Sequence, residues 1–218
     1  IAALLAALLI TLPLGGCGSI PAPPAETAAP ETATPEPAEL PTEPPEPTPE
    51  PTPEPAPLAD PADFAYTEVI NETLGVRFDC PTAWTLNPAR KTLRYDEPTP
   101  GGATPARLAI TYTTVNKKPD ANAMKRQMAR FMDMLGQQYG SVTPLKTSTK
   151  ESVMGVPSYM QRYAADNGGE QVLGMVFLAY VQEGRRLYLV HLSAQGDRYN
   201  ALESTWKEIV ASIRRVSS

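Results

Sequence analysis

Residues 171–193 read QVLGMVFLAYVQEGRRLYLVHLS, and this stretch decides the fold class of the chain. It contains two runs rich in β-branched and aromatic residues, Gln171–Val181 and Arg186–Ser193, separated by Gln182-Glu183-Gly184-Arg185. Two such runs joined by a short polar segment with a glycine are typical of a β-hairpin. The stretch therefore predicts two neighbouring antiparallel strands.

Further strand-like runs lie on the N-terminal side of this hairpin. Apolar runs bounded by turn residues predict strands at 64–70, 74–78, 107–115, 143–154 and 156–164, and a strand that resumes at Trp84 after Pro81. We expect turns at Asn71-Glu72, near Gly155 and at 166–170. The last segment, DNGGE, carries carboxylates but lacks the alternating ligand spacing of a calcium loop, so we expect a hairpin turn there.

Two segments have the periodicity of amphipathic helices. From Asp120, a good N-cap, apolar residues recur every three or four positions until Gly140, which suits the C-terminal cap. Asp197 is the expected cap of a second helix, whose apolar face comprises Leu202, Trp206, Ile209, Val210, Ile213 and Val216. Two such helices can cover the apolar faces of a sheet. We therefore predict an α+β fold, an antiparallel sheet of about six or seven strands flanked by two main helices.

The N-terminal residues 1–16 have the character of a secretory signal peptide. Residues 1–14 form an uncharged apolar run that is shorter than the roughly 20 residues a membrane-spanning helix needs. No initiator Met or basic region precedes the run, so we expect the start of the signal to be truncated. Leu14-Gly15-Gly16-Cys17 resembles the lipobox of bacterial lipoproteins.

The lipobox resemblance implies that Cys17 receives a diacylglyceryl group and becomes the mature N-terminus after cleavage. Two long acyl chains hold a protein on a membrane without a transmembrane helix. The resemblance thus implies an extracytoplasmic protein that is lipid-anchored to the bacterial membrane. The alternative is an ordinary signal peptide that is cut at small residues, with an incidental cysteine.

Residues 17–61 are predicted to be a disordered, proline- and glutamate-rich tether. Residues 21–61 contain 16 of the 25 prolines and nine acidic residues, and no Lys or Arg precedes Arg77. At about 3.1 Å per residue, an extended polyproline-II chain of this length reaches roughly 130 Å. Alternatively, the segment could bind an aromatic groove or carry O-glycans on its threonines. Removing the nine acids from the total of 24 leaves 15 against 19 bases, so the globular domain expected at 62–218 carries a net charge of about +4.

The stretch GVRFDCPTAW, residues 75–84, resembles the opening of PsbP-like domains, in which a hydrophobic residue follows Gly and the pattern F-x-x-P-x-x-W comes next. The order of the central helix, the strand pair around Gly155, the long hairpin and the closing helix ending at Ile213 is similar too. Such domains include the extrinsic photosystem II subunit, a nuclear factor that binds the Ran GTPase, and many bacterial lipoproteins. The resemblance implies a compact antiparallel sheet flanked by helices and a role in docking on a partner, without a common catalytic site.

Few residues have the pattern of an active site. His191, the only histidine, alternates with large apolar residues on its strand, and no G-x-S-x-G motif accompanies it. Cys80 stands where the PsbP-like pattern usually has an aromatic or aliphatic residue, which favours a small buried hydrophobe. We therefore expect no catalytic residue, metal or cofactor. The open alternatives are a small envelope enzyme that uses carboxylates or Cys80, and a structural or stress-related lipoprotein without a specific ligand.

Basic residues occur in close pairs, which indicate either a surface patch for anionic lipid or wall polymer, or scattered solvated charges. They are Lys117, Lys118, Lys125, Arg126 with Arg130, Arg185 and Arg186. We expect a lipid-anchored envelope protein that presents a non-catalytic binding domain on its tether. Its partners would be the membrane, through lipidated Cys17, and an envelope protein or wall polymer, but not nucleic acid. The oligomeric state stays open.

Overall fold

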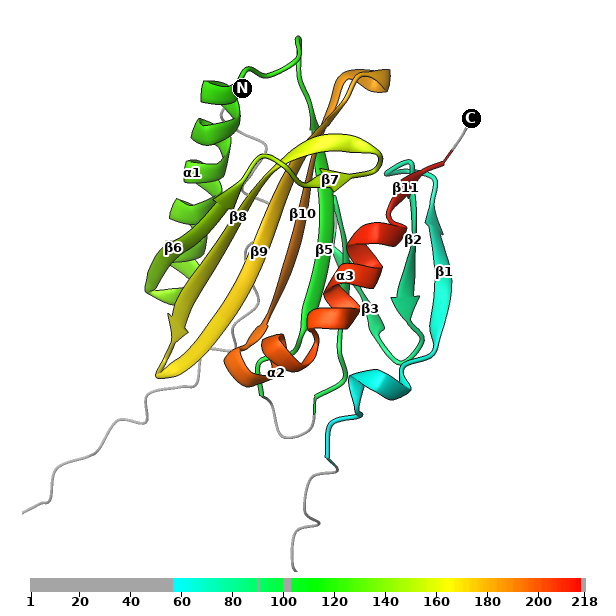
Figure 1. Cartoon of the computed structure of the whole chain (residues 1–218), viewed down its shortest axis with the longest axis vertical. Helices are drawn as coiled ribbons and strands as arrows, with labels where there is room; N and C mark the ends of the chain where they lie inside the picture. Colours follow the sequence, from blue (N-terminus) through cyan, green and yellow to red (C-terminus); the bar gives the residue numbers. More distant parts are fainter. Residues whose placement is uncertain (1–56, 90, 100–102, 217–218) are drawn as a thin grey trace, which may run out of the picture. The chain divides into compact units, whose positions relative to one another are not determined.

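The computed structural model describes residues 57–89, 91–99 and 103–216, and the predicted signal peptide, the lipobox and most of the predicted tether lie outside them. Figure 1 shows the arrangement of the elements. The strands are β1 Tyr66–Asn71, β2 Val76–Pro81, β3 Thr85–Ala89, β4 Thr92–Asp96, β5 Arg107–Thr114, β6 Ser141–Ser148, β7 Ser152–Val153, β8 Val156–Asn167, β9 Glu170–Val181, β10 Arg186–Gln195 and β11 Arg214–Arg215. The helices are α1 Ala121–Tyr139, α2 Gly196–Ala201 and α3 Glu203–Ser212, with short 3-10 turns η2 Pro61–Asp63 and η4 Glu183–Arg185.

The main sheet is antiparallel, and its strands lie in the order β3-β4-β5-β10-β9-β8-β6, with β7 paired to β8 off this path. The expected hairpin at 171–193 forms its centre, where Val181 pairs with Arg186 and Val172 with Gln195. The predicted α+β fold with about seven antiparallel strands is confirmed. A second, three-stranded sheet in the order β1-β2-β11 was not foreseen.

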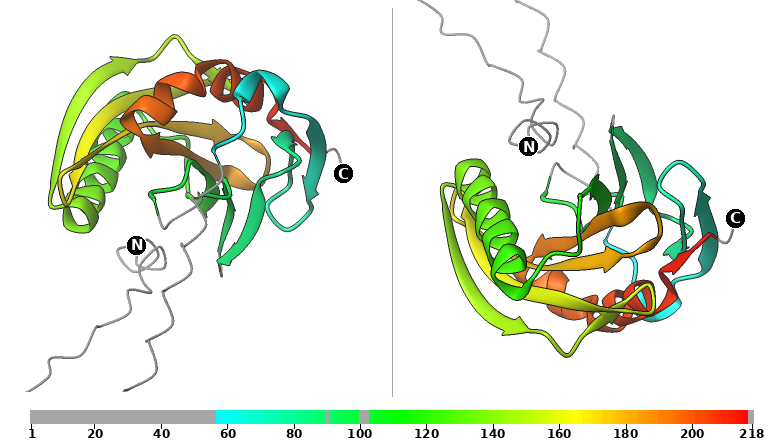
Figure 2. Two further views of the ribbon diagram at one scale, coloured as in Figure 1. Left: turned by 90° about the horizontal axis from the view of Figure 1, so that it is seen from below. Right: turned by 90° about the horizontal axis from the view of Figure 1, so that it is seen from above.

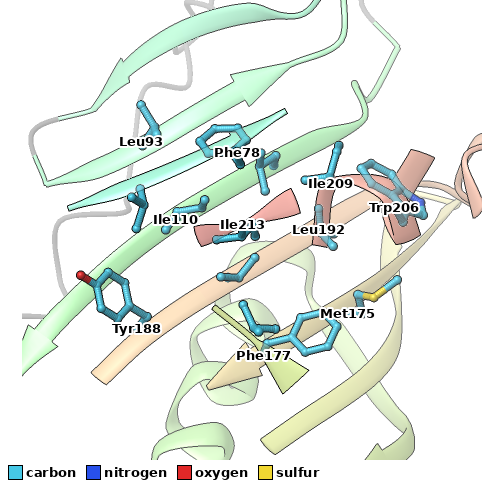
Figure 3. Packing of buried hydrophobic residues seen from close by; sticks show 14 of the residues in the cluster. Phe78, Leu93, Ile110, Met175, Phe177, Tyr188, Leu192, Trp206, Ile209 and Ile213 are labelled. Atoms are coloured by element: carbon cyan, nitrogen blue, oxygen red, sulfur yellow. The ribbon is translucent and has the colours of Figure 1, made fainter. Parts of the chain in front are cut away.

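The main sheet is covered on both faces (Figure 2). Successive residues of β9 alternate between two cores, so that Val176 and Leu178 face α1 whereas Met175 and Phe177 face the other layer. That other layer consists of α2, α3 and the small sheet. Figure 3 shows Trp206 and Ile209 of α3, and Ile213 directly after the helix, gathered with Phe78, Ile110 and Leu192. Burial on both faces explains why β9 and β10 are almost continuously apolar in sequence.

Helix α1 begins and ends as the sequence predicts. The side chain of Asp120 accepts a hydrogen bond from the backbone N–H of Ala123 (2.7 Å), and Gly140 caps the helix with φ of +81°. The buried side chains of the helix are Met128, Phe131, Met132, Leu135 and Tyr139.

The second predicted helix differs from expectation in three respects. It ends at Ser212, so Ile213 and Val216 lie outside it, because Arg214 and Arg215 pair with β2 as strand β11. It is divided into α2 and α3 at Leu202, and Asp197 lies inside α2 and not at its cap. Gln195 occupies the cap position without a side-chain hydrogen bond. Tertiary packing explains the break, because Leu202 is fully buried in the core between Tyr199 and Trp206. Among the described helices, none is long and apolar enough to cross a membrane.

Candidate functional site

The two ends of the main sheet carry different charges. We call one end the hairpin end, where β9 turns into β10 and β5 leaves toward α1; there Arg186 pairs with both Val181 and Thr114. The opposite end, the tether end, holds residues 57–63, because a guanidinium N–H of Arg198 donates to the carbonyl oxygen of Ala59 (2.8 Å). Figure 1 shows residues 57–63, in cyan, at the same end of the domain as α2.

The hairpin end carries a group of exposed cations that we call the basic face. The backbone N–H of Val115 donates to the carbonyl of Arg185 (2.9 Å), which holds the loop before α1 against the β9–β10 turn. The basic face comprises Lys117 and Lys118 in the loop and Arg185 in the turn, and within the described residues these three cations form no ion pair. Lys125, Arg126 and Arg130 are also exposed, but they are distributed along α1, which lies apart from the β9–β10 turn in Figure 1. A common surface formed by all of these cations stays a prediction.

Arg186, which the sequence groups with these cations, has a different environment. Its guanidinium lies over the ring of Tyr112, 4.4 Å from the centroid, and its Nη1 donates to the carbonyl of Leu74 (3.0 Å). A hydrogen bond with Tyr188 raises the pKa of Arg186. Gly75 lies beside the same guanidinium and has φ of +68°, a backbone conformation that favours glycine. Arg186 thus fastens the main sheet to the β1–β2 turn and is not a free surface cation.

A shallow groove of about 380 Å³ lies beside Arg186. Its charged lining is balanced, with Glu72 and Glu183 opposed to Arg186 and Arg215. Arg215 and Glu183 form an ion pair of 3.2 Å. The groove therefore adds no net charge to the hairpin end.

The tether end is acidic. Its exposed carboxylates come from η2, the β8–β9 turn and α2, namely Asp60, Asp63, Asp166, Glu170 and Asp197. Three arginines near this end are paired with carboxylates: Arg94 and Arg107 pair with Asp96, and Arg198 forms a bidentate pair with the buried Glu97. This polarity was not predicted from the sequence. The sequence could have indicated it, because every second connection between the strands of an antiparallel sheet lies at the same end of the sheet. The β8–β9 turn at 166–170 and the start of α2 are two such connections, so their carboxylates lie at one end.

His191 lies beneath α1 and is buried, with 3% of its surface exposed. Its Nε2 is 2.8 Å from the hydroxyl of Tyr163, and its ring packs edge-to-face on Phe131. Burial, with a smaller contribution from the charge of Arg107, lowers the pKa of His191 to about 3. The side chain is thus a neutral, hydrogen-bonded member of the core, as its alternation with apolar residues indicates.

Cys80 lies on β2 in the core between the two sheets, with 1% of its surface exposed. Burial raises the pKa of its thiol to about 12. Nucleophilic cysteines are thiolates in partly exposed, electropositive surroundings, and Cys80 has the opposite environment. It fills the position of a small hydrophobe.

The turn expected at 166–170 is confirmed, since Asp166 Oδ1 accepts a hydrogen bond from the backbone N–H of Gly169 (2.9 Å).

No protein-family model and no curated protein matches the chain. Among solved structures, the Ran-binding protein Mog1p of Saccharomyces cerevisiae is similar with a TM-score of 0.53 and 12% identity, over 71% of this chain and 97% of that protein. The cyanobacterial PsbP of Synechocystis has a TM-score of 0.53 and 13% identity, over 70% of this chain and 93% of that protein. At such identity the likeness concerns the fold alone, which is the PsbP/Mog1-like fold that the stretch 75–84 indicates.

Proposed function

We propose that this protein is a lipid-anchored bacterial envelope protein that presents a non-catalytic binding domain on a proline-rich, acidic tether. One observation carries the proposal. The residues best suited to catalysis, His191 and Cys80, are buried in packing roles, whereas exposed cations gather at the hairpin end. That end lies opposite the point where residues 57–63 join the domain.

The anchoring part of the proposal rests on the sequence. An apolar leader, the lipobox-like Leu14-Gly15-Gly16-Cys17 and the acidic, proline-rich segment follow one another in the order expected of a tethered lipoprotein. A tether that joins the domain at the end opposite the basic face leaves that face unobstructed for partners in the envelope. Mog1p, which shares the fold, is a Ran-binding protein, so the fold is compatible with docking.

The competing enzyme hypothesis has little support from the two side chains that it would use. A general base must reach its substrate, but Nε2 of His191 is occupied by Tyr163 beneath α1. A thiol with a pKa near 12 is not a nucleophile at neutral pH. An enzyme that works through carboxylates alone is the remaining alternative, and the photo-crosslinking experiment described below tests it against docking.

Acyl labelling tests the anchor. The full chain, expressed in a bacterium fed an alkyne analogue of palmitate, should be labelled and recovered with membranes. Cys17→Ala should abolish the label, whereas Cys80→Ala, the matched control at the other cysteine, should keep it. Label on the Cys17→Ala protein, or none on the wild type, would contradict lipid attachment at Cys17.

Site-specific photo-crosslinking tests docking through the hairpin end. A photo-reactive residue replaces Asn116, which is exposed beside the basic face, or Asn200, which is exposed on α2 at the tether end. In intact cells, position 116 should give a discrete crosslinked product and position 200 should not. Equal products from both positions would contradict the proposed orientation. An absence of products from both would favour the structural or enzymatic alternatives.

A further inference from the structure

We infer that Asn167 is a site of spontaneous deamidation, which converts its side-chain amide to a carboxylate and adds a negative charge to the tether end. The inference does not depend on the proposed function. Asn167 is the only asparagine of the sequence that is followed by glycine. It lies at the β8–β9 turn, where Asn167, Gly168 and Gly169 are all exposed. The site is therefore open to water.

The reaction needs only the side chain of Asn167, the next peptide nitrogen and water. The backbone nitrogen of Gly168 loses its proton and attacks Cγ of Asn167, so that a new C–N bond closes a five-membered imide ring. The bond from Cγ to Nδ2 breaks, and this nitrogen takes up a proton and leaves as ammonia. Water then opens the ring at one of its two carbonyls, which leaves aspartate or isoaspartate at position 167. No oxidant or cofactor takes part.

The turn leaves the attacking nitrogen accessible. Asn167 pairs with Glu170 in the register of β8 and β9. The two glycines between them form a two-residue turn, with φ of +65° and +94°. The N–H of Gly169 donates to Oδ1 of Asp166 (2.9 Å), whereas the N–H of Gly168 has no hydrogen-bond acceptor among the described residues. A Cβ at position 168 would have no neighbour within 4 Å, so the space beside this nitrogen is open.

One contact of the amide should slow the reaction. Nδ2 of Asn167 donates to the hydroxyl of Thr104 (3.3 Å), and this hydroxyl donates to Oε2 of Glu170 (3.2 Å). The contact to Thr104 stabilises the unreacted amide and is lost when Nδ2 leaves as ammonia. Removing one such hydrogen bond should therefore accelerate deamidation by about 2- to 10-fold.

The products change the tether end locally. A carboxylate at position 167 cannot donate to Thr104, and it stands between the carboxylates of Asp166 and Glu170. Residues 103–106 thereby lose one of the contacts that hold them to the β8–β9 turn. Isoaspartate also lengthens the main chain by one atom, which disturbs the pairing of position 167 with Glu170. Neither product returns to asparagine in water, so modified copies accumulate with the age of the protein.

Uptake of oxygen-18 from labelled water tests the inference. The purified full chain is kept folded in neutral detergent and labelled water at pH 7 and pH 9 for up to four weeks. It is then digested in ordinary water at acidic pH, and its peptides are analysed by mass spectrometry. Label should appear at position 167, and sooner at pH 9 because the reaction begins with the loss of a proton. Asn116 and Asn200, which are exposed but precede Lys and Ala, should stay unlabelled.

A sample unfolded in urea gives the rate for an unrestrained chain. The unfolded fraction of a stable domain is about one thousandth or less. A rate in the folded chain below one thousandth of the rate in urea would show that only unfolded molecules react, and it would overturn the inference. Equal labelling of positions 116, 167 and 200 in the folded chain would overturn it as well.

Matched variants assign the roles of the side chains. Thr104→Val should raise the labelling rate by about 2- to 10-fold, whereas Thr143→Val, which removes an exposed hydroxyl from β6, should leave it unchanged. The same rate in both variants would contradict the role of Thr104. Asn167→Gln keeps an amide but would have to close a six-membered ring, so its peptide should stay unlabelled. Label in that peptide would show that another residue reacts.

Discussion

Gly174→Ala should destabilise the domain strongly, because the ring of Tyr163 lies across Gly174. The two residues are partners in the β8–β9 register. A Cβ at position 174 would be 2.4 Å from Cε1 and Cζ of Tyr163. The ring has little freedom to yield, since it is fully buried under α1 and its hydroxyl is hydrogen-bonded to His191.

The size of the destabilisation can be estimated from the contacts and the hydrogen bond that the Tyr163 ring would lose. Carbon atoms in contact lie about 3.5–4.0 Å apart, so the ring has to move by more than about 1 Å. Overpacking of this kind costs about 1–3 kcal/mol. The movement also breaks the buried hydrogen bond to His191, which adds about 1–3 kcal/mol. Together these contributions lead us to expect that Gly174→Ala lowers the free energy of unfolding by about 2–6 kcal/mol.

The sign should reverse when the ring is absent. In a Tyr163→Ala background the new methyl group meets no ring, and alanine is preferred to glycine within a strand by about 0.5–1 kcal/mol. Urea unfolding of the four full-length proteins, followed by fluorescence of the buried Trp84 and Trp206, measures this double-mutant cycle. Trimethylamine N-oxide, added equally to all four, keeps the weakest variant folded. The same loss from Gly174→Ala in both backgrounds would refute the steric argument.

Three further predictions concern buried polar and titratable groups. Burial holds the pKa of His191 near 3, below its value in the unfolded chain, so the unfolded chain takes up a proton first as the pH falls. The free energy of unfolding should therefore fall by up to about 1.4 kcal/mol per pH unit between pH 6.5 and pH 3. His191→Gln should reduce this slope in urea titrations at pH 6, 5 and 4. Arg198→Ala leaves the Glu97 carboxylate buried without its cation, so the free energy of unfolding measured by chemical denaturation should fall by about 3–5 kcal/mol. Adding Glu97→Gln should restore a substantial part of this loss. If it restores none, the packing of Arg198 and not the ion pair dominates. In a Cys17→Ala chain, Cys80 should react with a disulfide reagent at pH 8 only in urea concentrations that unfold the domain, and immediate reaction would contradict its burial.

The parts of the fold that sequence predicts well have strong local signals. The apolar runs of β9 and β10, and the cap, periodicity and final glycine of α1, each specify an element without reference to the rest of the chain. Strand β4 was missed although Arg94 and Asp96 alternate with Leu93 and Tyr95 in the period of a strand; it has only five residues, and Arg94 and Asp96 pair with each other on its polar face. Strand β11 has only two residues, and its pairing with β2 depends on where α3 ends.

The candidate site was predictable only in part, because it is assembled from distant segments. The sequence indicates the basic pairs, but the hydrogen bond between Val115 and Arg185 is what brings the loop and the turn together. Neighbouring residues of one pair also have different roles. Arg185 precedes β10 and is exposed, whereas Arg186 begins the strand and turns its guanidinium onto Tyr112.

The position of residue 59 opposite the basic face has a mechanical consequence. Strand β1 runs from Tyr66 at the tether end to Asn71 at the hairpin end, antiparallel to β2. If the chain is anchored as proposed, a force between the anchor and a partner bound at the hairpin end would therefore run along these strands and load them in shear. The six residue pairs of the ladder would be strained together and would not peel apart one by one. The hydrogen bond from Arg198 to Ala59 lies ahead of the ladder and would take the load first.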